Sequence, residues 1–377
     1  MPSIFGDFVS WLPVGLPAFL FIITVVVFFH ELGHFLVARA FGVSVQSFSV
    51  GFGKELIGWT DSKGTRWKIS LLPLGGYVKF AGDADAASRP DAEELKEMDP
   101  ATRAGSLHFK PLYQRALVVA AGPIANFILA IVIYSVVFMM LGRPVAVPDP
   151  IIGTIVPGSA AAEAGIQSGD VIKSFNGQTV NTFAEFSSLV RSGEGKPVLL
   201  QMERKSEIYE ITVSPRLSQL PPDDEGHIAN AYLVGVGPTT LYEPVGPITS
   251  VGLASERTWW IVKTTMYTLG GIVSGHSSAD QLSGPIGIAG VAGQVAEQGF
   301  VDLILLAGLL SVSIGLINLF PIPMLDGGHL LYYAFEAIRG RPLGERAQEL
   351  GFRLGLAFVL CLMLFATFND LVRYKIF

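Results

Sequence analysis

The stretch 28–39 reads FFHELGHFLVAR, and it directly follows the apolar run FLFIITVVV at 19–27. The run is typical of a membrane-spanning helix, but His30, Glu31 and His34 stand where hydrocarbon-facing side chains are expected. An ionisable side chain at the centre of a membrane helix costs about 3 kcal/mol on insertion scales and by default marks a functional site. The stretch therefore predicts a membrane helix that carries chemistry.

The composition of the whole chain agrees with a membrane protein. Of 377 residues, 50% are hydrophobic and only 15% are charged, whereas soluble domains average about 25% charged residues. The net charge of -6 gives no general attraction to nucleic acid, so we expect no nucleic-acid partner. The one cysteine, Cys361, allows no disulfide framework and does not report the redox compartment.

Segments near 14–37, 115–141, 301–320 and 353–371 are each apolar over roughly the 20 residues that a spanning helix needs. They predict a polytopic α-helical membrane protein with four transmembrane helices. The first basic residue is Arg39, so the start of the chain lacks the basic region of a signal peptide and we expect the first segment to be retained as an anchor.

The basic residues predict the orientation in the membrane. The segment 39–115 contains eleven Lys and Arg and 339–353 contains four, whereas 1–38 contains none. Cytoplasmic loops carry the excess of basic residues, so both basic segments are expected inside and both termini outside. The segment 142–300 is then extracytoplasmic, since long domains translocate largely regardless of charge.

Within the outer segment, residues 150–216 contain short apolar runs separated by turn dipeptides, a helical stretch near 182–192, and two alternating strands. The pattern resembles a PDZ domain rather than an unrelated small β-domain. The resemblance rests on Ala164-Gly165, Gly169-Asp170-Val171-Ile172 and Asn176-Gly177. PDZ domains bind an extended peptide by adding it as a strand.

Two further stretches leave alternatives open. Residues 44–80 predict two apolar strands, which form either a membrane-associated sheet with an edge for an extended partner or a small hairpin that only packs on the helices. Residues 247–270, with Trp259 and Trp260, predict either an amphipathic helix on the membrane surface or an ordinary packing helix.

His30-Glu31-Leu32-Gly33-His34 is an H-E-x-x-H pattern. On a helix, residues four apart share a face, so both imidazoles can bind one metal ion. Glu31 then stands where it can take a proton from a water at the metal. The alternative is that these residues are polar contacts between helices, or that their side chains reach out to the membrane interface.

A catalytic zinc usually has three protein ligands, and the other carboxylate at membrane depth is Asp326, in NLFPIPMLDGGH. Pro321 and Pro323 break the third span there, and irregular backbone is tolerated at that depth only where it is buried or lines a cavity. Asp326 is therefore the best third ligand; the alternative is a solvated carboxylate beyond the helix end. We expect His329 to lie behind the ligands rather than among them.

Together these motifs resemble the site-2 protease family of intramembrane zinc metalloproteases, and the PDZ-like insertion resembles its regulator-of-sigma-E protease branch. Well-known members of that branch carry two tandem PDZ domains, whereas this chain has room for one. The resemblance covers nearly the whole chain. It rests on His30-Glu31-Leu32-Gly33-His34, Gly51-Phe52-Gly53, Gly122-Pro123-x-x-Asn126, Ser283-Gly284-Pro285-Ile286 and Asn318-x-x-Pro321-x-Pro323-x-Leu325-Asp326-Gly327-Gly328.

The resemblance implies a Zn²⁺ endopeptidase of the bacterial inner membrane that cuts single-span membrane proteins, such as anti-sigma factors and remnant signal peptides, after a first cut by another protease. It implies zinc ligation by both histidines and Asp326, with Glu31 as general base and the active site near the cytoplasmic face. It also implies substrate binding at Gly51, Phe52 and Gly53. Asn126 and Asn318 either bind the substrate, by polarising the scissile carbonyl or orienting it, or join helices.

The expected fold is thus four transmembrane helices, a cytoplasmic-side membrane-associated β-sheet and one extracytoplasmic PDZ domain that binds a peptide, in contact with membrane lipids. The alternatives for function are a PDZ-bearing membrane scaffold with an inactive or structural metal site, and a metal transporter. The expected regions are 1–43 with H-E-x-x-H, 44–112 with the sheet, span 113–141, PDZ domain 150–216, linker and amphipathic region 217–300, span 301–328 with L-D-G-G, and 329–377 with the fourth span.

Overall fold

The structure, a computed structural model, divides the chain into two compact units. One contains Met1–Val136, Val251–Val262 and Ala279–Phe377, and the other contains Val137–Ser250 and Lys263–Ser278. The expected outer positions of the chain ends, and residues 221–228 of the expected linker and amphipathic region 217–300, lie outside the described residues. The structure describes residues 12–83, 95, 97–220, 229–276, 278–279 and 282–373.

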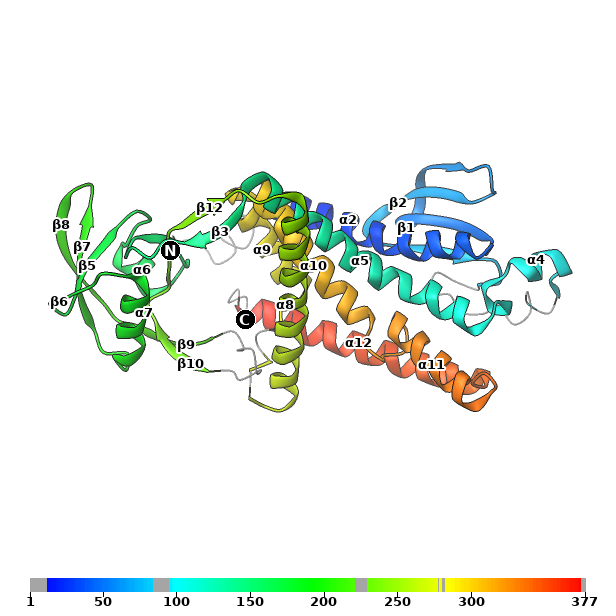
Figure 1. The fold of residues 1–377 in the computed structure, drawn as a ribbon. Coiled ribbons are helices and arrows are strands. Elements are labelled where there is room, and N and C mark those ends of the chain that lie inside the picture. Colours follow the sequence, from blue (N-terminus) through cyan, green and yellow to red (C-terminus); the bar gives the residue numbers. More distant parts are fainter. Residues whose placement is uncertain are drawn as a thin grey trace. The chain divides into compact units, whose positions relative to one another are not determined.

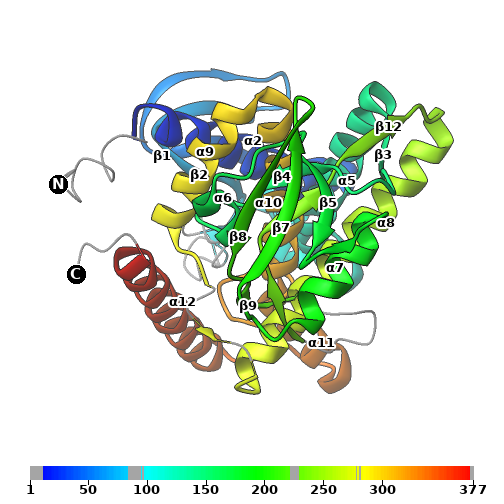
Figure 2. The same cartoon turned by 90° about the vertical axis from the view of Figure 1, so that its left-hand side faces the viewer.

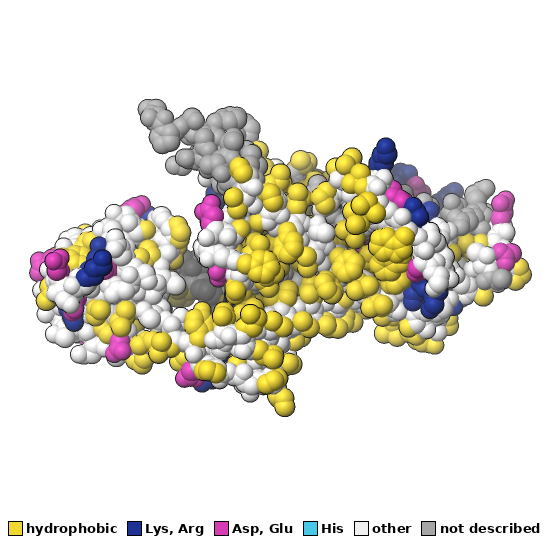
Figure 3. Space-filling view, turned by 90° about the horizontal axis from the view of Figure 1, so that it is seen from above, with side chains coloured by type: hydrophobic (Ala, Val, Ile, Leu, Met, Phe, Trp, Pro, Cys, Tyr) yellow, Lys and Arg dark blue, Asp and Glu magenta, His cyan; other side chains and the backbone are white. Residues whose placement is uncertain are grey.

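Four helices among the described residues are long and apolar enough to cross a membrane. Even the shortest has 19 residues and is therefore about 28 Å long, close to the hydrocarbon thickness of a bilayer. Hydrophobic side chains cover much of the exposed surface of the helical part (Figure 3). The helices are α2 (Leu12–Ala40), α5 (Leu112–Leu141), α10 (Phe300–Asn318) and α12 (Glu345–Arg373) (Figure 1).

Three of these helices pack closely because small residues lie where they meet. A side chain at Gly33 of α2 would overlap the carbonyl oxygen of Ala121 in α5, and an added Cβ at Gly315 of α10 would lie 3.1 Å from the Cβ of Asn126 in α5. The Ser311 hydroxyl of α10 also donates a hydrogen bond of 2.8 Å to the Asn126 carbonyl. Small residues let membrane helices approach closely, so α2, α5 and α10 meet around one region.

Strands β1 (Val45–Thr60) and β2 (Arg66–Phe80) form an antiparallel sheet beside α2 (Figure 1). Val50 pairs with Gly76 and also with Ile69. A strand residue can pair with one neighbouring strand on each side, so the start of β1 lies between the end and the start of β2. The start of β2 also pairs with the end of β1, so the two bent strands form a sheet that is four segments wide. This sheet occupies the region where the sequence predicts two apolar strands.

The bend in β1 falls at Gly51 and Gly53, which both have φ of +88°. Side chains other than glycine rarely adopt this left-handed conformation, which explains why glycine stands at both positions. The last segment of β2, Gly76–Phe80, pairs only with the start of β1. Its other edge therefore has no strand partner among the described residues.

The turn between the two strands is tied to the end of α2. Arg39 Nη2 lies 2.5 Å from Asp61 Oδ2 and donates to Thr65 Oγ1 over 2.7 Å. Burial alone would raise the pKa of Asp61, but hydrogen bonds from Trp67, Thr65, Lys63 and Arg39 outweigh it and lower the pKa to about 2. The charged form of Asp61 is thus stabilised by folding.

We expect Asp61→Asn to lower the thermal midpoint at neutral pH, because the amide loses the ion pair with Arg39. The folded pKa lies below the ordinary value of 3.8. The stabilisation of the wild-type fold by ionised Asp61 should therefore be complete above pH 3.8, and it should disappear as the pH falls towards about 2. Thermal melts across this range, with Glu55→Gln as a control on the same sheet, check the prediction. Parallel acid curves for wild type and Asp61→Asn would contradict it.

Shorter helices complete the first unit. Asp370, near the end of α12, is fully buried and accepts hydrogen bonds of 3.1 and 2.8 Å from the Gly284 and Gly287 amides at the start of α9. Such capping satisfies amides that a helix start leaves unpaired. The shorter helices are α4 (Pro100–Gly105), the 3₁₀ turn η1 (Leu107–Phe109), α9 (Pro285–Gln298) and α11 (Asp326–Arg339).

Helix α8 (Pro247–Val273) lies over the stretch predicted as helical, and its Trp259 and Trp260 are both exposed.

The second unit is built on a four-stranded antiparallel sheet with the order β6-β5-β7-β8 (Figure 1), and Figure 2 shows β5, β7 and β8 from another side. Its core contains Ile172, Leu200 and Met202 from the sheet and Phe186 from α7. The helix start at Thr182 is capped by its own hydroxyl, which accepts from the Glu185 amide. The elements are α6 (Ala160–Ala164), β5 (Val171–Phe175), β6 (Gln178–Thr179), α7 (Phe183–Ser192), β7 (Val198–Arg204) and β8 (Glu207–Val213).

This unit extends beyond the expected boundaries 150–216. Strands after that range pair back onto strands before and inside it, so part of the expected linker belongs to the unit. These strands have only three or four residues each, and most of their partners are distant in sequence. They are therefore too short for an alternation of apolar and polar residues to predict them. The pairs are β3 (Arg143–Ala146) with β12 (Thr240–Glu243), β4 (Ile152–Ile155) with β11 (Val236–Pro238), and β9 (Arg216–Gln219) with β10 (Asn230–Leu233).

Candidate active site

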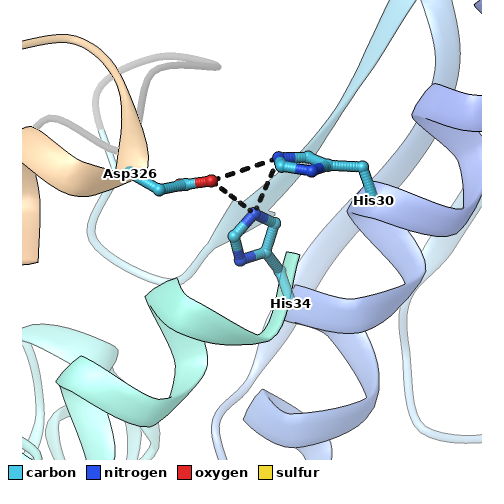
Figure 4. A group of neighbouring side chains, drawn as sticks. All are labelled: His30, His34 and Asp326. Carbon is cyan, nitrogen blue, oxygen red and sulfur yellow. Dashed lines mark hydrogen bonds and ion pairs between the residues drawn. The ribbon is translucent and has the colours of Figure 1, made fainter. Parts of the chain in front are cut away.

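The side chains of His30, His34 and Asp326 point toward one another (Figure 4). The histidines lie one turn apart on α2, and Asp326 is the first residue of α11. Asp326 Oδ2 lies 3.2 Å from His30 Nε2 and 3.6 Å from His34 Nε2, and the two nitrogens are 3.3 Å apart. The structure therefore brings together the three side chains that the sequence predicts as metal ligands.

The geometry of these three atoms fits a zinc ion. Ligand atoms about 2.0–2.1 Å from zinc at tetrahedral angles lie about 3.3 Å from one another, close to the three observed separations. Asp326 Oδ2 is also buried with no hydrogen bond that would satisfy it. Two imidazoles and one carboxylate are a donor set that zinc accepts, and three protein ligands leave one position open, as in catalytic zinc sites.

Asp326 reaches the histidines because the third span ends early. The sequence predicted a third span over 301–328 that includes L-D-G-G. In the structure, helix α10 already ends at Asn318, and L-D-G-G begins the separate helix α11. Proline has no amide for a helix and clashes with the preceding turn, which accounts for the break. Within the turn, Met324 has φ of +90°, a strained conformation for a residue with a side chain. Added side chains at Gly327 or Gly328 would overlap backbone carbonyls of the turn.

The fourth span supports this turn from behind. A Cβ at Gly355 of α12 would overlap the carbonyl oxygen of Pro323, and one at Gly351 would overlap the Tyr332 hydroxyl. The absence of side chains at these two positions therefore lets α12 lie against the turn that carries Asp326.

We expect Gly355→Ala to move the turn and lower the affinity for zinc by about tenfold or more, the size of effect found when groups behind metal ligands are removed. Zinc retention against a competing chelator is the measurement. Gly344→Ala is the control, because an added Cβ there meets open space. Wild-type zinc retention in Gly355→Ala would show that α12 does not position Asp326.

Each histidine is oriented by a group on α5. His34 Nδ1 donates a hydrogen bond of 2.9 Å to the Val118 carbonyl, which leaves Nε2 free for a metal. A side chain at Gly122 would overlap the His34 ring. His30 Nδ1 lies 3.3 Å from the Asn126 amide group, whose oxygen is buried without a partner. Turning this amide by half a turn makes the oxygen the acceptor for Nδ1–H, as ligation through Nε2 requires.

A cavity of about 310 Å³ opens beside the three ligand atoms. Glu31 lines it, and a backbone hydrogen bond from Val78 of β2 reaches the Glu31 carboxylate. Gly76 faces this glutamate, because an added Cβ there would lie 3.4 Å from Glu31 Cγ. The bent sheet thus brings its last strand segment directly over the acidic residue of the H-E-x-x-H motif.

Of the five residues predicted to bind substrate, two line the cavity and three do not. Phe52 lines the cavity, with its ring 5.9 Å from that of Tyr77, whereas Gly51 and Gly53 form bends beside it and do not line it. Asn318 lines the cavity, but Asn126 lies behind His30. His329 also lines the cavity and contributes no atom to the three-ligand cluster.

Sequence reasoning missed much of the cavity wall. The adjacent glycines Gly75 and Gly76 inside a strand pattern were the available signal, since such glycines often mark a close backbone approach. Met324 and Tyr333 gave no signal that separates them from ordinary apolar residues. His108, a lone histidine in the segment before α5, gave none either. All five line the cavity.

Comparison with known proteins decides the family. The family model described as Peptidase family M50 matches residues 18–362. The chain belongs to peptidase family M50. It is 45% identical over 361 residues to a "Putative zinc metalloprotease" of Rhizobium meliloti (strain 1021), covering 94% of this chain and 96% of that protein.

Two other relatives support the assignment. Metalloprotease MmpA of Caulobacter vibrioides is 40% identical, with 97% of each chain covered, and Protease RseP of Yersinia pestis is 32% identical, with 95% of this chain and 98% of that protein covered. This M50 protein is thus a membrane metalloprotease of the site-2 protease family, its cofactor is zinc, and its four apolar helices make it a multi-pass membrane protein.

Proposed function

We propose that this M50 protease cuts the transmembrane segment of single-span membrane proteins, near the cytoplasmic face, after another protease has removed their outer domain. The observation that carries the proposal is that one cavity is lined by His30, His34, Asp326 and Glu31 and also by the edge of a β-sheet. Its zinc ligands come from a membrane-spanning helix and from the turn after another. A protease site so placed acts on peptide bonds at membrane depth.

In the proposed mechanism, His30, His34 and Asp326 hold the zinc ion. Held by these three residues, the ion would supply Lewis-acid chemistry for the scissile carbonyl and for a water molecule at neutral pH. Glu31 takes a proton from the attacking water as the new C–O bond forms, and it then delivers that proton to the amide nitrogen as the C–N bond breaks. We assign Asn318, which lines the cavity, as a hydrogen-bond donor to the carbonyl oxygen.

Substrate binding requires that a helix be unwound, because its backbone amides and carbonyls are otherwise paired with one another. In a membrane the released groups need new partners. The outer edge of Gly76–Phe80 has no strand partner among the described residues and lies beside Glu31. Its Val78 and Phe80 amides already donate to Glu31 and Asp83, so its remaining backbone groups are the ones it offers, and Phe52 offers an apolar wall. We therefore assign strand addition at the sheet, with Gly51 and Gly53 shaping the bend that presents Phe52.

We assign the second unit as a single PDZ domain that binds an extended segment or a peptide C-terminus outside the cytoplasm. Supporting features are the left-handed Gly165 after α6 and the buried Asp170, which pairs with Arg204 over 2.7 Å. The basic segments 39–115 and 339–353 favour a cytoplasmic position for the β-sheet, periplasmic termini and the bacterial inner membrane as location. The substrates in this proposal are anti-sigma factors and remnant signal peptides.

The alternative of a scaffold with a structural metal site is less well supported. Structural zinc sites have four protein ligands, and among the described residues the cluster has three.

The fragments that accumulate in cells making Glu31→Gln protein test the proposed substrate class. We expect membrane fragments with one apolar segment and a shortened outer domain, identified by mass spectrometry of the membrane fraction. If only intact, full-length membrane proteins accumulate, the preceding cut is not part of the function. If no membrane protein differs from cells making the wild type, the proposed substrate class is wrong.

A further inference from the structure

A second polar pair borders the active-site cavity and has no role in the mechanism above. Asp83 follows β2, and His108 lies in the η1 turn before α5. His108 Nε2 is 2.8 Å from Asp83 Oδ1. Asp83 is fully buried, whereas the His108 side chain is 21% exposed and lines the cavity. A buried carboxylate that holds a cavity-lining imidazole calls for an explanation.

The contacts of Asp83 fix which nitrogen of His108 is occupied. Asp83 Oδ2 already accepts a hydrogen bond of 2.9 Å from the Phe80 amide, and an ionised carboxylate only accepts. With Asp83 ionised, His108 Nε2 carries the hydrogen that Asp83 Oδ1 accepts. In the neutral imidazole, Nδ1 is then an acceptor. No residue that the structure describes makes a hydrogen bond to this nitrogen.

The surroundings of His108 favour a main-chain partner. Leu107 and Phe80, which line the cavity near His108, are buried and apolar, whereas His329, which also lines it, interacts electrostatically with His108. A polar group that enters beside the two apolar residues without a partner is costly. An unwound peptide brings amides on both of its edges, and a strand at the sheet pairs only one of them. The amides on the other edge need acceptors within the cavity.

We propose that His108 is a substrate-binding residue, whose Nδ1 accepts a hydrogen bond from a backbone amide of the unwound substrate, with Asp83 as the positioning residue that fixes the ring. This inference rests on the proposed function, because it assumes an unwound peptide in the cavity. It adds a contact from the segment between β2 and α5 to those from the sheet.

The competing explanation is that Asp83 and His108 only hold this segment in place. The two explanations give different roles to the two nitrogens of His108: the structural one needs only Nε2, whereas the proposal also needs Nδ1. Glutamine places its amide where Nε2 lies, so His108→Gln keeps the bond to Asp83 and loses the atom at Nδ1. Asparagine places its amide oxygen near Nδ1, so His108→Asn keeps that acceptor and loses the bond to Asp83.

The experiment uses a synthetic single-span peptide in which one backbone amide at a time, near the cut, is replaced by an ester. An ester has no N–H to donate. At one position we expect the ester to raise KM about tenfold in the wild type, the effect of one lost hydrogen bond, and by a similar factor in His108→Asn. In His108→Gln the same ester should change KM less than about twofold, because the acceptor is already missing.

Zinc content and thermal midpoint are measured for each variant, so that loss of the fold is recognised. The inference is overturned if His108→Gln responds to the esters as the wild type does at every position, which is the pattern of a purely structural pair. It is also overturned if no ester position distinguishes the variants. If the wild-type protein fails to cut the all-amide peptide, the proposed function fails instead.

Discussion

Replacing Glu31 by glutamine reduces peptide hydrolysis by about 10²- to 10⁴-fold, the range for loss of a general acid–base group, while zinc stays bound. Glutamine has nearly the same shape as glutamate, but it cannot take a proton from water. His30, His34 and Asp326 are unchanged in this variant, so the three ligand atoms remain. Cleavage of a single-span substrate and zinc content of the same purified sample are the two measurements.

Glu349→Gln is the matched control, because Glu349 lies on the exposed part of α12 and pairs with Arg353. It should cleave at the wild-type rate. Undiminished cleavage by Glu31→Gln would remove Glu31 from the mechanism. Loss of zinc together with activity would mean instead that Glu31 supports the metal site, for example through its contact with Val78 of β2.

Replacing Asp326 by alanine should abolish both zinc binding and hydrolysis. The two histidines alone leave zinc with two protein ligands, one fewer than catalytic sites have. Removing a group that only supports a metal ligand typically lowers the metal affinity about 10- to 100-fold. We therefore expect removal of the ligand Asp326 itself to lower the zinc affinity more than about 100-fold. Metal analysis after dialysis at a fixed free zinc concentration measures this directly.

Asp302→Ala is a suitable control, because Asp302 lies at the opposite end of α10 and lines no part of the cavity. Equal zinc content in Asp326→Ala and the wild type would remove Asp326 from the ligand set. His329, which lines the same cavity, would then be the next residue to test.

The metal cluster could be predicted because its physical causes are local. The spacing of His30 and His34 places both on one face of a helix, and the two prolines announce that the third span is broken before Asp326. The sequence did not reveal how the break is built. The strained Met324 and the contact of Gly355 with Pro323 depend on a helix that lies later in the chain.

The cavity wall and the second unit were less predictable, because they too depend on contacts between segments that are distant in sequence. The path of β2 over Glu31 depends on the bends at Gly51 and Gly53, and the two pairing partners of Val50 cannot be read from alternation alone. The position of Asn126 behind His30 depends on how closely α2 and α5 pack. In the second unit, three short strand pairs join segments far apart in sequence, and only three-dimensional pairing identifies them.

The central claim is that this cavity hydrolyses a peptide bond inside the membrane. The most direct test is the intact mass of the products formed when purified wild-type protein and a single-span substrate are reconstituted together in lipid vesicles. We expect two fragments whose new ends fall within the apolar segment, in its cytoplasmic half, and neither fragment with Glu31→Gln. A cut outside the apolar segment, or the same fragments from the glutamine variant, would contradict the account.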